Sequence, residues 1–115
     1  MSLPKFVHVG GMRIAVQLTK QPTAADGEAC EGVYIVEDGV IQIKRSLRME
    51  RKWIKLAHEM AHAAIDDANL DLMLRNIVGD DARAVKLEED IVDVISGPFV
   101  GALRTAGWLH FPGER

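Results

Sequence analysis

Short apolar runs in the first part of the chain alternate with turn-forming residues and predict β-strands. The four runs cover residues 6–9, 12–18, 33–36 and 40–43. The first two flank Gly10-Gly11 and the last two flank Glu37-Asp38-Gly39, and both connections are typical of hairpins. Residues 19–31 lack periodicity, so we expect a loop there. The pattern predicts two hairpins in a small antiparallel sheet of three to four strands.

After Ser46 the apolar residues recur three and four positions apart, which is the period of an amphipathic helix. This spacing predicts a helix over about residues 48–65, with Ser46 as its N-cap. A second helical segment is expected over about residues 68–77 and should end near Gly79, because glycine commonly terminates helices.

A third helix is expected after Asp80 or Asp81, either of which could cap its first turn. Its apolar positions are Val85, Leu87, Ile91, Val92, Val94 and Ile95. Gly97-Pro98 should break or kink this helix, and helical periodicity then resumes until Gly107. No repeat or domain boundary is visible. Residues 1–115 are therefore predicted to form a single α+β domain, with the sheet packed on the helix 48–65 and the third helix.

Composition restricts the class of protein. The 115 residues are 48% hydrophobic and 27% charged, with a formal net charge of −3. This balance is ordinary for a globular protein and offers no basic surface for nucleic acid. The single Cys30, interpreted as an incidental thiol, favours a reducing compartment. No signal peptide is visible, and no apolar run approaches the roughly 20 residues that span a bilayer, so we expect a cytoplasmic protein without a membrane partner.

The strongest chemical signal is His58-Glu59-Met60-Ala61-His62, which has the form His-Glu-x-x-His inside the first predicted helix. Residues four apart lie on one face of a helix, so both imidazoles could bind one Zn²⁺ at about 2.0–2.1 Å. Glu59 would lie beside the metal-bound water and accept its proton as the water attacks a peptide carbonyl. The motif therefore predicts a zinc hydrolase.

A catalytic zinc site normally has three protein ligands and one open position. The candidates for the third ligand are His8, His110 and a carboxylate on the third helix. We prefer Glu88, because on a helical wheel it falls in an apolar stripe, where a carboxylate without a partner is costly. That stripe contains Leu87, Ile91, Val92 and Ile95. Glu89, turned about 100° around the helix, is the alternative.

Two further roles stay open at the level of sequence. Tyr34, His110, His8 or an arginine could stabilise the developing oxyanion, and nothing in the sequence selects one of them. Asp66 or Asp67, at the end of the first helix, could accept the outer N–H of a zinc-bound histidine.

The order of these elements resembles the ImmA/IrrE group and related small phage and prophage zinc metallopeptidases. The resemblance rests on the hairpin strands, the segment 56–63 with the motif, and a later helix with Glu88-Glu89, and covers about residues 32–105. It implies a minimal zincin-like fold in which His58, His62 and a glutamate hold zinc. It also implies cleavage of a protein, often a repressor or another regulator, with Glu59 as the base.

The same resemblance gives Val40–Ile43 the place of the peptide-facing edge strand. The family's usual end of the third-ligand helix is replaced here by Ser96-Gly97-Pro98-Phe99.

The motif is compatible with three functions. The first is a minimal zinc-dependent endopeptidase that acts on a protein or peptide. The second is a non-catalytic zinc-binding module that uses the same fold to hold a partner. Glu59 favours the first, because a non-catalytic module has no need of a base at that position. A third interpretation, an interaction protein without a metal, requires His58 and His62 to face apart as core residues.

Overall fold

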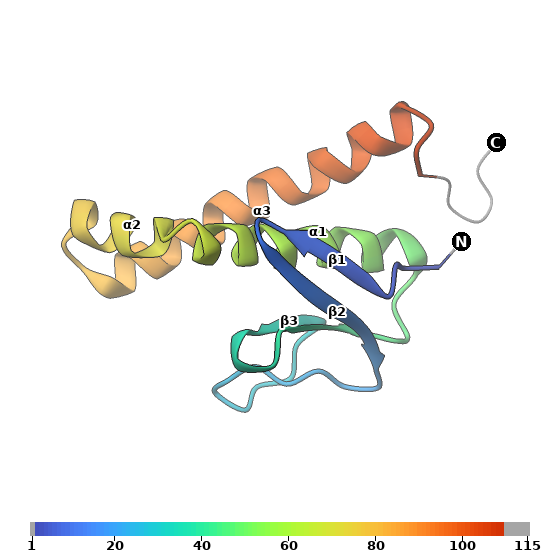
Figure 1. The fold of residues 1–115 in the computed structure, drawn as a ribbon, viewed down its shortest axis with the longest axis horizontal. Helices are drawn as coiled ribbons and strands as arrows, with labels where there is room; N and C mark the ends of the chain where they lie inside the picture. The colour runs from blue at the N-terminus through green and yellow to red at the C-terminus, as the bar shows by residue number, and fades with distance from the viewer. Residues whose placement is uncertain (1, 110–115) are drawn as a thin grey trace.

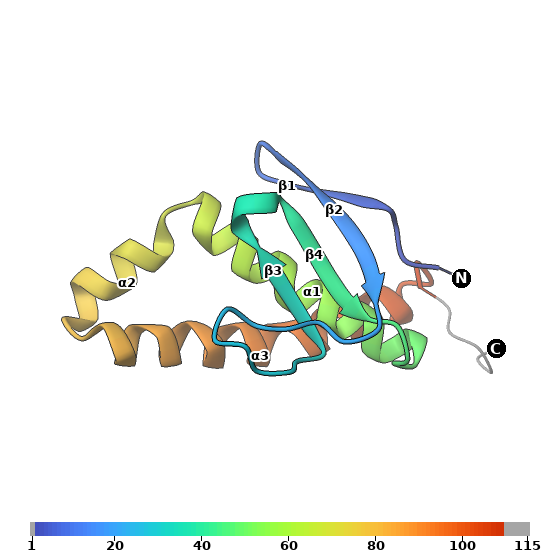
Figure 2. The same ribbon diagram turned by 90° about the horizontal axis from the view of Figure 1, so that it is seen from below.

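Four strands form one mixed sheet in the order β1-β2-β4-β3 (Figures 1 and 2). The computed structural model describes residues 2–109. In it the strands are β1 (Phe6–Val9), β2 (Met12–Thr19), β3 (Gly32–Ile35) and β4 (Val40–Lys44). Both predicted hairpins are present, since β1 pairs with β2 and β3 pairs with β4 in antiparallel fashion. The predicted α+β class is confirmed.

The prediction of a purely antiparallel sheet is wrong at one place. Strands β2 and β4 run parallel, with Ala15 paired with Val40 and Thr19 with Lys44. Segment 20–31 connects β2 to the second hairpin. It returns the chain so that β4, and not β3, lies beside β2. As a result β4 lies inside the sheet, and β1 and β3 are its two edges.

Three helices follow the sheet: α1 (Met49–Asp67), α2 (Leu70–Val78) and α3 (Asp81–Thr105). The predicted N-cap at Ser46 is wrong, because α1 begins after Arg48 and no side chain caps it. Gly79 ends α2 with φ +74°, a conformation that favours glycine. The Asp80 carboxylate accepts a hydrogen bond from the backbone N–H of Arg83 at 3.1 Å, so the prediction of a cap at this position is confirmed.

The expected break at Gly97-Pro98 does not occur, because α3 continues through Pro98 to Thr105. A proline removes the hydrogen bond to the carbonyl four residues earlier, which here belongs to Val94. Val94 is one of the most exposed apolar residues of α3, so water can reach this region of the helix. The chain thereby forms one long helix that extends along α2 and α1 (Figure 2).

Helix α1 is the central element of the fold, because it packs against the sheet and against α3. Its Leu56 and Ala63 join buried strand residues in the main core. The strand residues of that core are Val9, Ile14, Ile41 and Ile43. On another side of α1, Ile54 and Ala57 pack against Val100 of α3. No helix in residues 2–109 is long and apolar enough to cross a membrane.

The buried face of α3 differs from the expected one. Its buried residues are Ala84, Val92, Ser96 and Val100, at intervals of eight, four and four residues along one ridge. The predicted core stripe of Leu87, Ile91 and Ile95 is instead partly exposed to solvent. Helix α3 packs mainly on α1 and α2, and the second apolar stripe beside the contact ridge stays largely uncovered by the elements between residues 2 and 109.

Candidate metal centre

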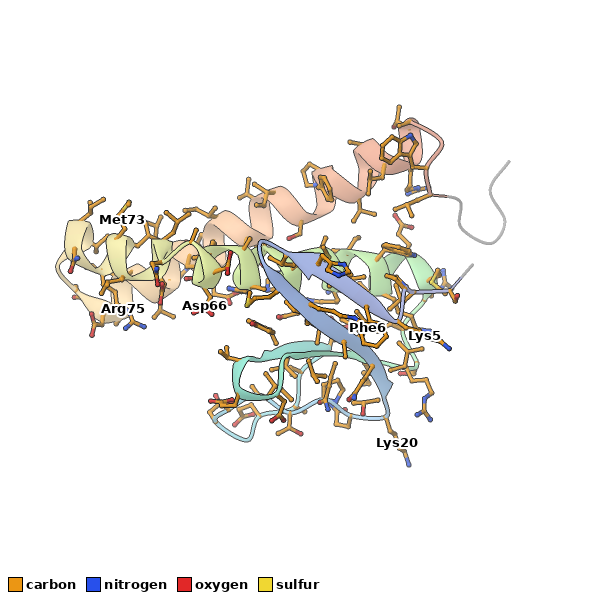
Figure 3. All side chains as sticks on the ribbon, in the orientation of Figure 1. Lys5, Phe6, Lys20, Asp66, Met73 and Arg75 are labelled. Carbon is orange, nitrogen blue, oxygen red and sulfur yellow. The ribbon has the colours of Figure 1, made fainter. Side chains whose placement is uncertain are left out.

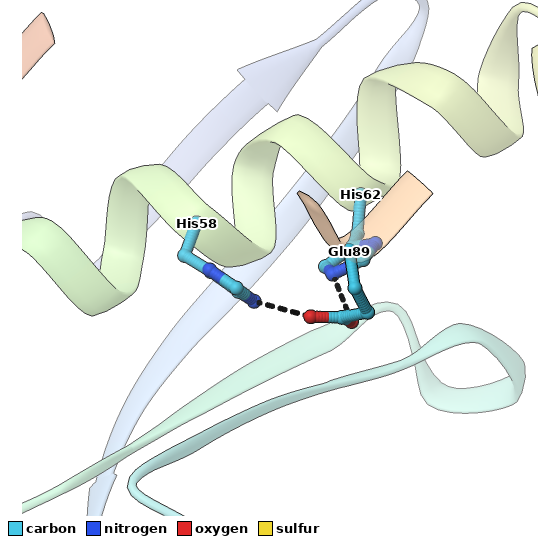
Figure 4. A group of neighbouring side chains, drawn as sticks. All are labelled: His58, His62 and Glu89. Atoms are coloured by element: carbon cyan, nitrogen blue, oxygen red, sulfur yellow. Dashed lines mark ion pairs between the residues drawn. The ribbon is translucent and has the colours of Figure 1, made fainter. Parts of the chain in front are cut away.

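His58 and His62 lie on one face of α1 and point into a cleft between α1, β3 and α3 (Figure 4). Their ring centroids are 4.9 Å apart, as expected for residues separated by one helical turn. The cleft has a volume of about 680 Å³. Both histidine side chains are largely buried at its wall. The two histidines therefore do not face apart, which is the arrangement that the interpretation without a metal requires.

Glu89 of α3 reaches both histidines from the opposite wall (Figure 4). Its Oε1 lies 2.7 Å from His62 Nε2, and its Oε2 lies 3.5 Å from His58 Nε2. One ligand atom from each of the three residues lies within 4.8 Å of the other two. Ligand atoms on one tetrahedral zinc are about 3.3 Å apart, so small side-chain adjustments would bring all three onto a common ion.

Glu88, the preferred ligand from the sequence, occupies a different place. Its Oε2 lies 2.5 Å from His62 Nδ1, on the side of the ring that faces away from Glu89. Asp93, one turn after Glu89 on α3, places its Oδ1 at 3.2 Å from His58 Nδ1. Each imidazole thus has its Nε2 directed at Glu89 and its Nδ1 directed at another carboxylate.

This arrangement matches the way proteins orient metal-binding histidines. A carboxylate that accepts the outer ring N–H fixes the tautomer and leaves the inner nitrogen free to bind a cation. Glu88 and Asp93 are placed for that role. The sequence had suggested Asp66 or Asp67, and neither forms an ion pair with His58 or His62 within residues 2–109.

Glu59 is buried beside the two histidines and is only 7% exposed. Burial raises the pKa of its carboxyl from 4.5 to about 7, and the positive potential of His62 and Lys55 opposes this shift only in part. Its Oε1 lies 4.0 Å from His58 Nε2. A carboxyl with a pKa near neutrality can both accept and return a proton at physiological pH.

Burial also affects His58, lowering the pKa of its imidazole below the ordinary value, and neighbouring His62 lowers it further. A neutral imidazole is the form that binds a metal. The surroundings of His58 therefore favour the protonation state that a metal site requires.

The other residues that the sequence suggested as ligands or oxyanion donors do not all lie at the histidine cluster. His8 lines an apolar groove on another face of α1 and is not part of the histidine cluster. Tyr34 and Arg75 line the cleft, so they stay candidates for contact with a substrate. The Tyr34 hydroxyl lies 3.8 Å from Met12 Sδ, which indicates a packing role in this state. His110 lies outside the described residues.

The strand that lines the cleft is β3, not Val40–Ile43. The expectation of an edge strand at Val40–Ile43 is wrong, because β4 is covered by β2 on one side and β3 on the other. Lys44 N–H donates to the Glu31 carbonyl at 2.8 Å. Hydrogen-bonded and non-hydrogen-bonded residue pairs alternate along an antiparallel ladder. Because Glu31 and Lys44 form a hydrogen-bonded pair, Gly32 and Tyr34 belong to non-hydrogen-bonded pairs. Their N–H and C=O groups therefore point away from β4, toward the free edge of β3.

Two features of the site were missed by sequence reasoning. Asp93 has a visible signal in retrospect, because it follows Glu89 by four residues and so lies on the same flank of α3. The position of β3 has no local signal, since it depends on the course of the segment 20–31.

Comparisons with protein-family models, with curated proteins and with solved structures returned no match. The function is therefore argued from the site alone.

Proposed function

We propose that this protein is a zinc-dependent metallopeptidase, with His58, His62 and Glu89 as metal ligands and Glu59 as general base. The observation that carries the proposal is the convergence of two imidazole Nε2 atoms on one carboxylate from a separate helix. The buried Glu59 beside them supports it further. This ligand set replaces Glu88 by its neighbour, for the geometric reason given above.

The donor set suits zinc. Two imidazoles and one carboxylate are a common combination at catalytic zinc sites, which keep a fourth position open. When bound, zinc would supply a Lewis acid that activates water and polarises the carbonyl of the substrate. Glu88 and Asp93 would hold the two imidazoles in the tautomer that presents Nε2 to the ion.

Glu59 would accept the proton of the attacking water and pass it to the leaving amine. Its burial fits this role, because removal from water raises the pKa of the carboxyl in the metal-free chain and so makes the carboxylate a better proton acceptor. Lys55 also lines the cleft, so its ammonium can contribute to binding the substrate main chain.

We further propose that an extended peptide binds along β3. The outward N–H and carbonyl of Tyr34 and the outward carbonyl of Gly32 can pair with a peptide by strand addition, which would lay its main chain across the cleft. An extended segment is also the conformation in which a peptide carbonyl is most accessible. The substrate class is therefore a flexible or unfolded segment of a protein.

The test combines metal content with hydrolysis by a matched pair of variants. Purified protein should contain one zinc per chain by elemental analysis and should cleave a mixture of unstructured peptides. Glu59→Gln should retain the metal and lose activity by about 10²-fold or more, because general-base catalysis contributes factors of this size. Glu37→Gln, the same chemical change on an exposed turn, should leave both unchanged.

The outcomes separate the possible functions. Failure of the protein to bind zinc or any other divalent ion would overturn the proposal. Bound zinc with no hydrolysis of any peptide would favour a non-catalytic zinc-binding module. Hydrolysis that survives Glu59→Gln would exclude Glu59 as the base.

A further inference from the structure

Helix α3 carries a continuous apolar stripe on the flank opposite to the metal centre. Its members are spaced four apart, so they form one row along the helix. They are Leu87, Ile91, Ile95, Phe99 and Leu103. Glu89 and Asp93 of the metal centre form a separate row, about 200° from Leu87 and Ile91 around the helix. Phe99 is 58% exposed and Ile95 is 48% exposed, so two large apolar side chains of the stripe contact solvent in the monomer.

The stripe borders an apolar groove of about 500 Å³. Ile95, Phe99 and Leu103 form one wall of the groove. Trp53 and Met60 of α1 lie between this wall and β1. Figure 1 shows the C-terminal half of α3 diverging from β1, which leaves this side of α1 open. Of the residues from 2 to 109, those that line the groove include His8 and Ser96 but no Asp, Glu, Lys or Arg.

Helix α2 extends the apolar surface. Met73 lies on one side of α2, and Arg75 lies on the other side, as does Asp66 at the end of α1; both Arg75 and Asp66 line the metal cleft (Figure 3). We define the α2–α3 face as eight exposed apolar side chains of these two helices. They are Leu72, Met73, Ile77, Leu87, Ile91, Val94, Ile95 and Phe99.

The area of this face is what a stable dimer needs. The eight residues are between 39% and 75% exposed. Together they offer on the order of 700 Å² of apolar surface, taking about 150–200 Å² for one large side chain. A standard interface buries about 800 Å² per partner, and the largest apolar patch of a typical monomer is about 300–600 Å².

The pattern is also self-complementary. If α3 crosses the α3 of a second copy antiparallel at Ile95, then Ile91 comes beside the partner's Phe99 one turn from the crossing point. Rows of residues four apart are the ridges that helices most often interlock. Lys86 and Asp90 beside the stripe form an ion pair at 2.6 Å, and Arg83, one turn before Leu87, lies 4.0 Å from Asp80. The charged side chains next to the stripe on the described part of α3 are therefore of both signs.

We propose that a second copy of this chain covers the α2–α3 face and forms a two-fold symmetric dimer through α3. Such a dimer is isologous, with the same surface used on both subunits. The metal clefts lie on the other flank of α3, so both would stay open to substrate. This inference does not depend on the proposed peptidase activity.

The test is sedimentation velocity of the full chain at low and high micromolar concentration. The wild-type protein should sediment as a dimer. Ile95→Glu should raise the dimer Kd by about 100-fold or more, because it places two carboxylates across the symmetry axis in an apolar interface. Val85→Glu is the matched control, because Val85 is 55% exposed on the same helix but lines the metal cleft. This control should remain dimeric.

Disulfide cross-linking provides a second test that does not require Ile95→Glu to fold. In a Cys30→Ser background, Ile95→Cys should form an intermolecular disulfide under mild oxidation, whereas Val85→Cys should not. A wild-type protein that is monomeric at high micromolar concentration would overturn the proposal. A folded Ile95→Glu variant that stays dimeric, or equal cross-linking at both positions, would do the same.

Discussion

The burial of Glu59 predicts that a carboxylate at this position destabilises the metal-free protein at neutral and alkaline pH. The pKa of Glu59 is raised from 4.5 to about 7, mainly because the folded chain removes the carboxylate from water. One pKa unit corresponds to about 1.4 kcal/mol, so the shift corresponds to about 3 kcal/mol. The side chain is only 9% exposed, so screening by solvent reduces this value little. That amount is a large part of the 5–15 kcal/mol that typically stabilises a domain.

The sign follows from the proton balance. Below about pH 4.5 the carboxyl is protonated in both the folded and the unfolded chain, and its contribution to stability is fully present. Between about pH 4.5 and pH 7 the unfolded chain releases the proton and the folded chain retains it, so the free energy of unfolding falls as pH rises. Above about pH 7 both states are ionised and the loss is complete. Glu59→Gln has no such loss, because its amide stays neutral.

Urea denaturation of metal-free protein measures this effect. At about pH 8, Glu59→Gln should be more stable than the wild type by up to about 3 kcal/mol, and at about pH 4 the two should be nearly equal. The difference between the variants isolates Glu59, because the other titrating groups are common to both. Glu37→Gln, on an exposed turn, should follow the wild type at both pH values. Equal stabilities of wild type and Glu59→Gln at about pH 8 would refute the reasoning.

Two other predictions test the assignment of roles around the cleft. Glu89→Gln should weaken zinc binding more than Glu88→Gln does, because Glu89 reaches Nε2 of both histidines and Glu88 contacts only Nδ1 of His62. For Glu88→Gln we expect a loss of about 10–100-fold in metal affinity, which is typical when the partner of an outer ring nitrogen is removed. Competition with a zinc-binding dye measures both, and the reverse order would return the ligand role to Glu88. Tyr34→Pro should raise KM for peptides above that of Tyr34→Ala, because both lose the phenol but only proline removes the outward N–H of β3. Equal KM values for these two variants would show that the peptide does not pair with this edge.

Features set by local sequence were predictable. The period of three and four residues identified α1, and the motif spacing alone places His58 and His62 on one face of it. Gly79 and Asp80 mark the end of α2 and the start of α3 because their effects act within one turn. Each of these features depends on residues that are close together in the chain.

Features set by packing were not predictable in the same way. Glu88 and Glu89 differ by about 100° around α3, and the choice between them depends on how Val92 and Ser96 rotate that helix against α1. The exposure of Ile91 and Ile95 has the same origin, since a helix wheel identifies an apolar stripe but not the element that covers it. The parallel pairing of β2 with β4 depends on a loop whose residues show no periodicity.

The central claim is that His58, His62 and Glu89 hold one zinc ion. Crystals of the zinc-loaded protein, with diffraction recorded on both sides of the zinc absorption edge, test it most directly. The account predicts one anomalous peak in the cleft, at about 2.0–2.2 Å from Nε2 of each histidine and from a Glu89 oxygen, with Glu88 and Asp93 on the outer ring nitrogens. Zinc-loaded crystals with no anomalous peak between α1 and α3, or with a peak bound by residues other than these three, would contradict it.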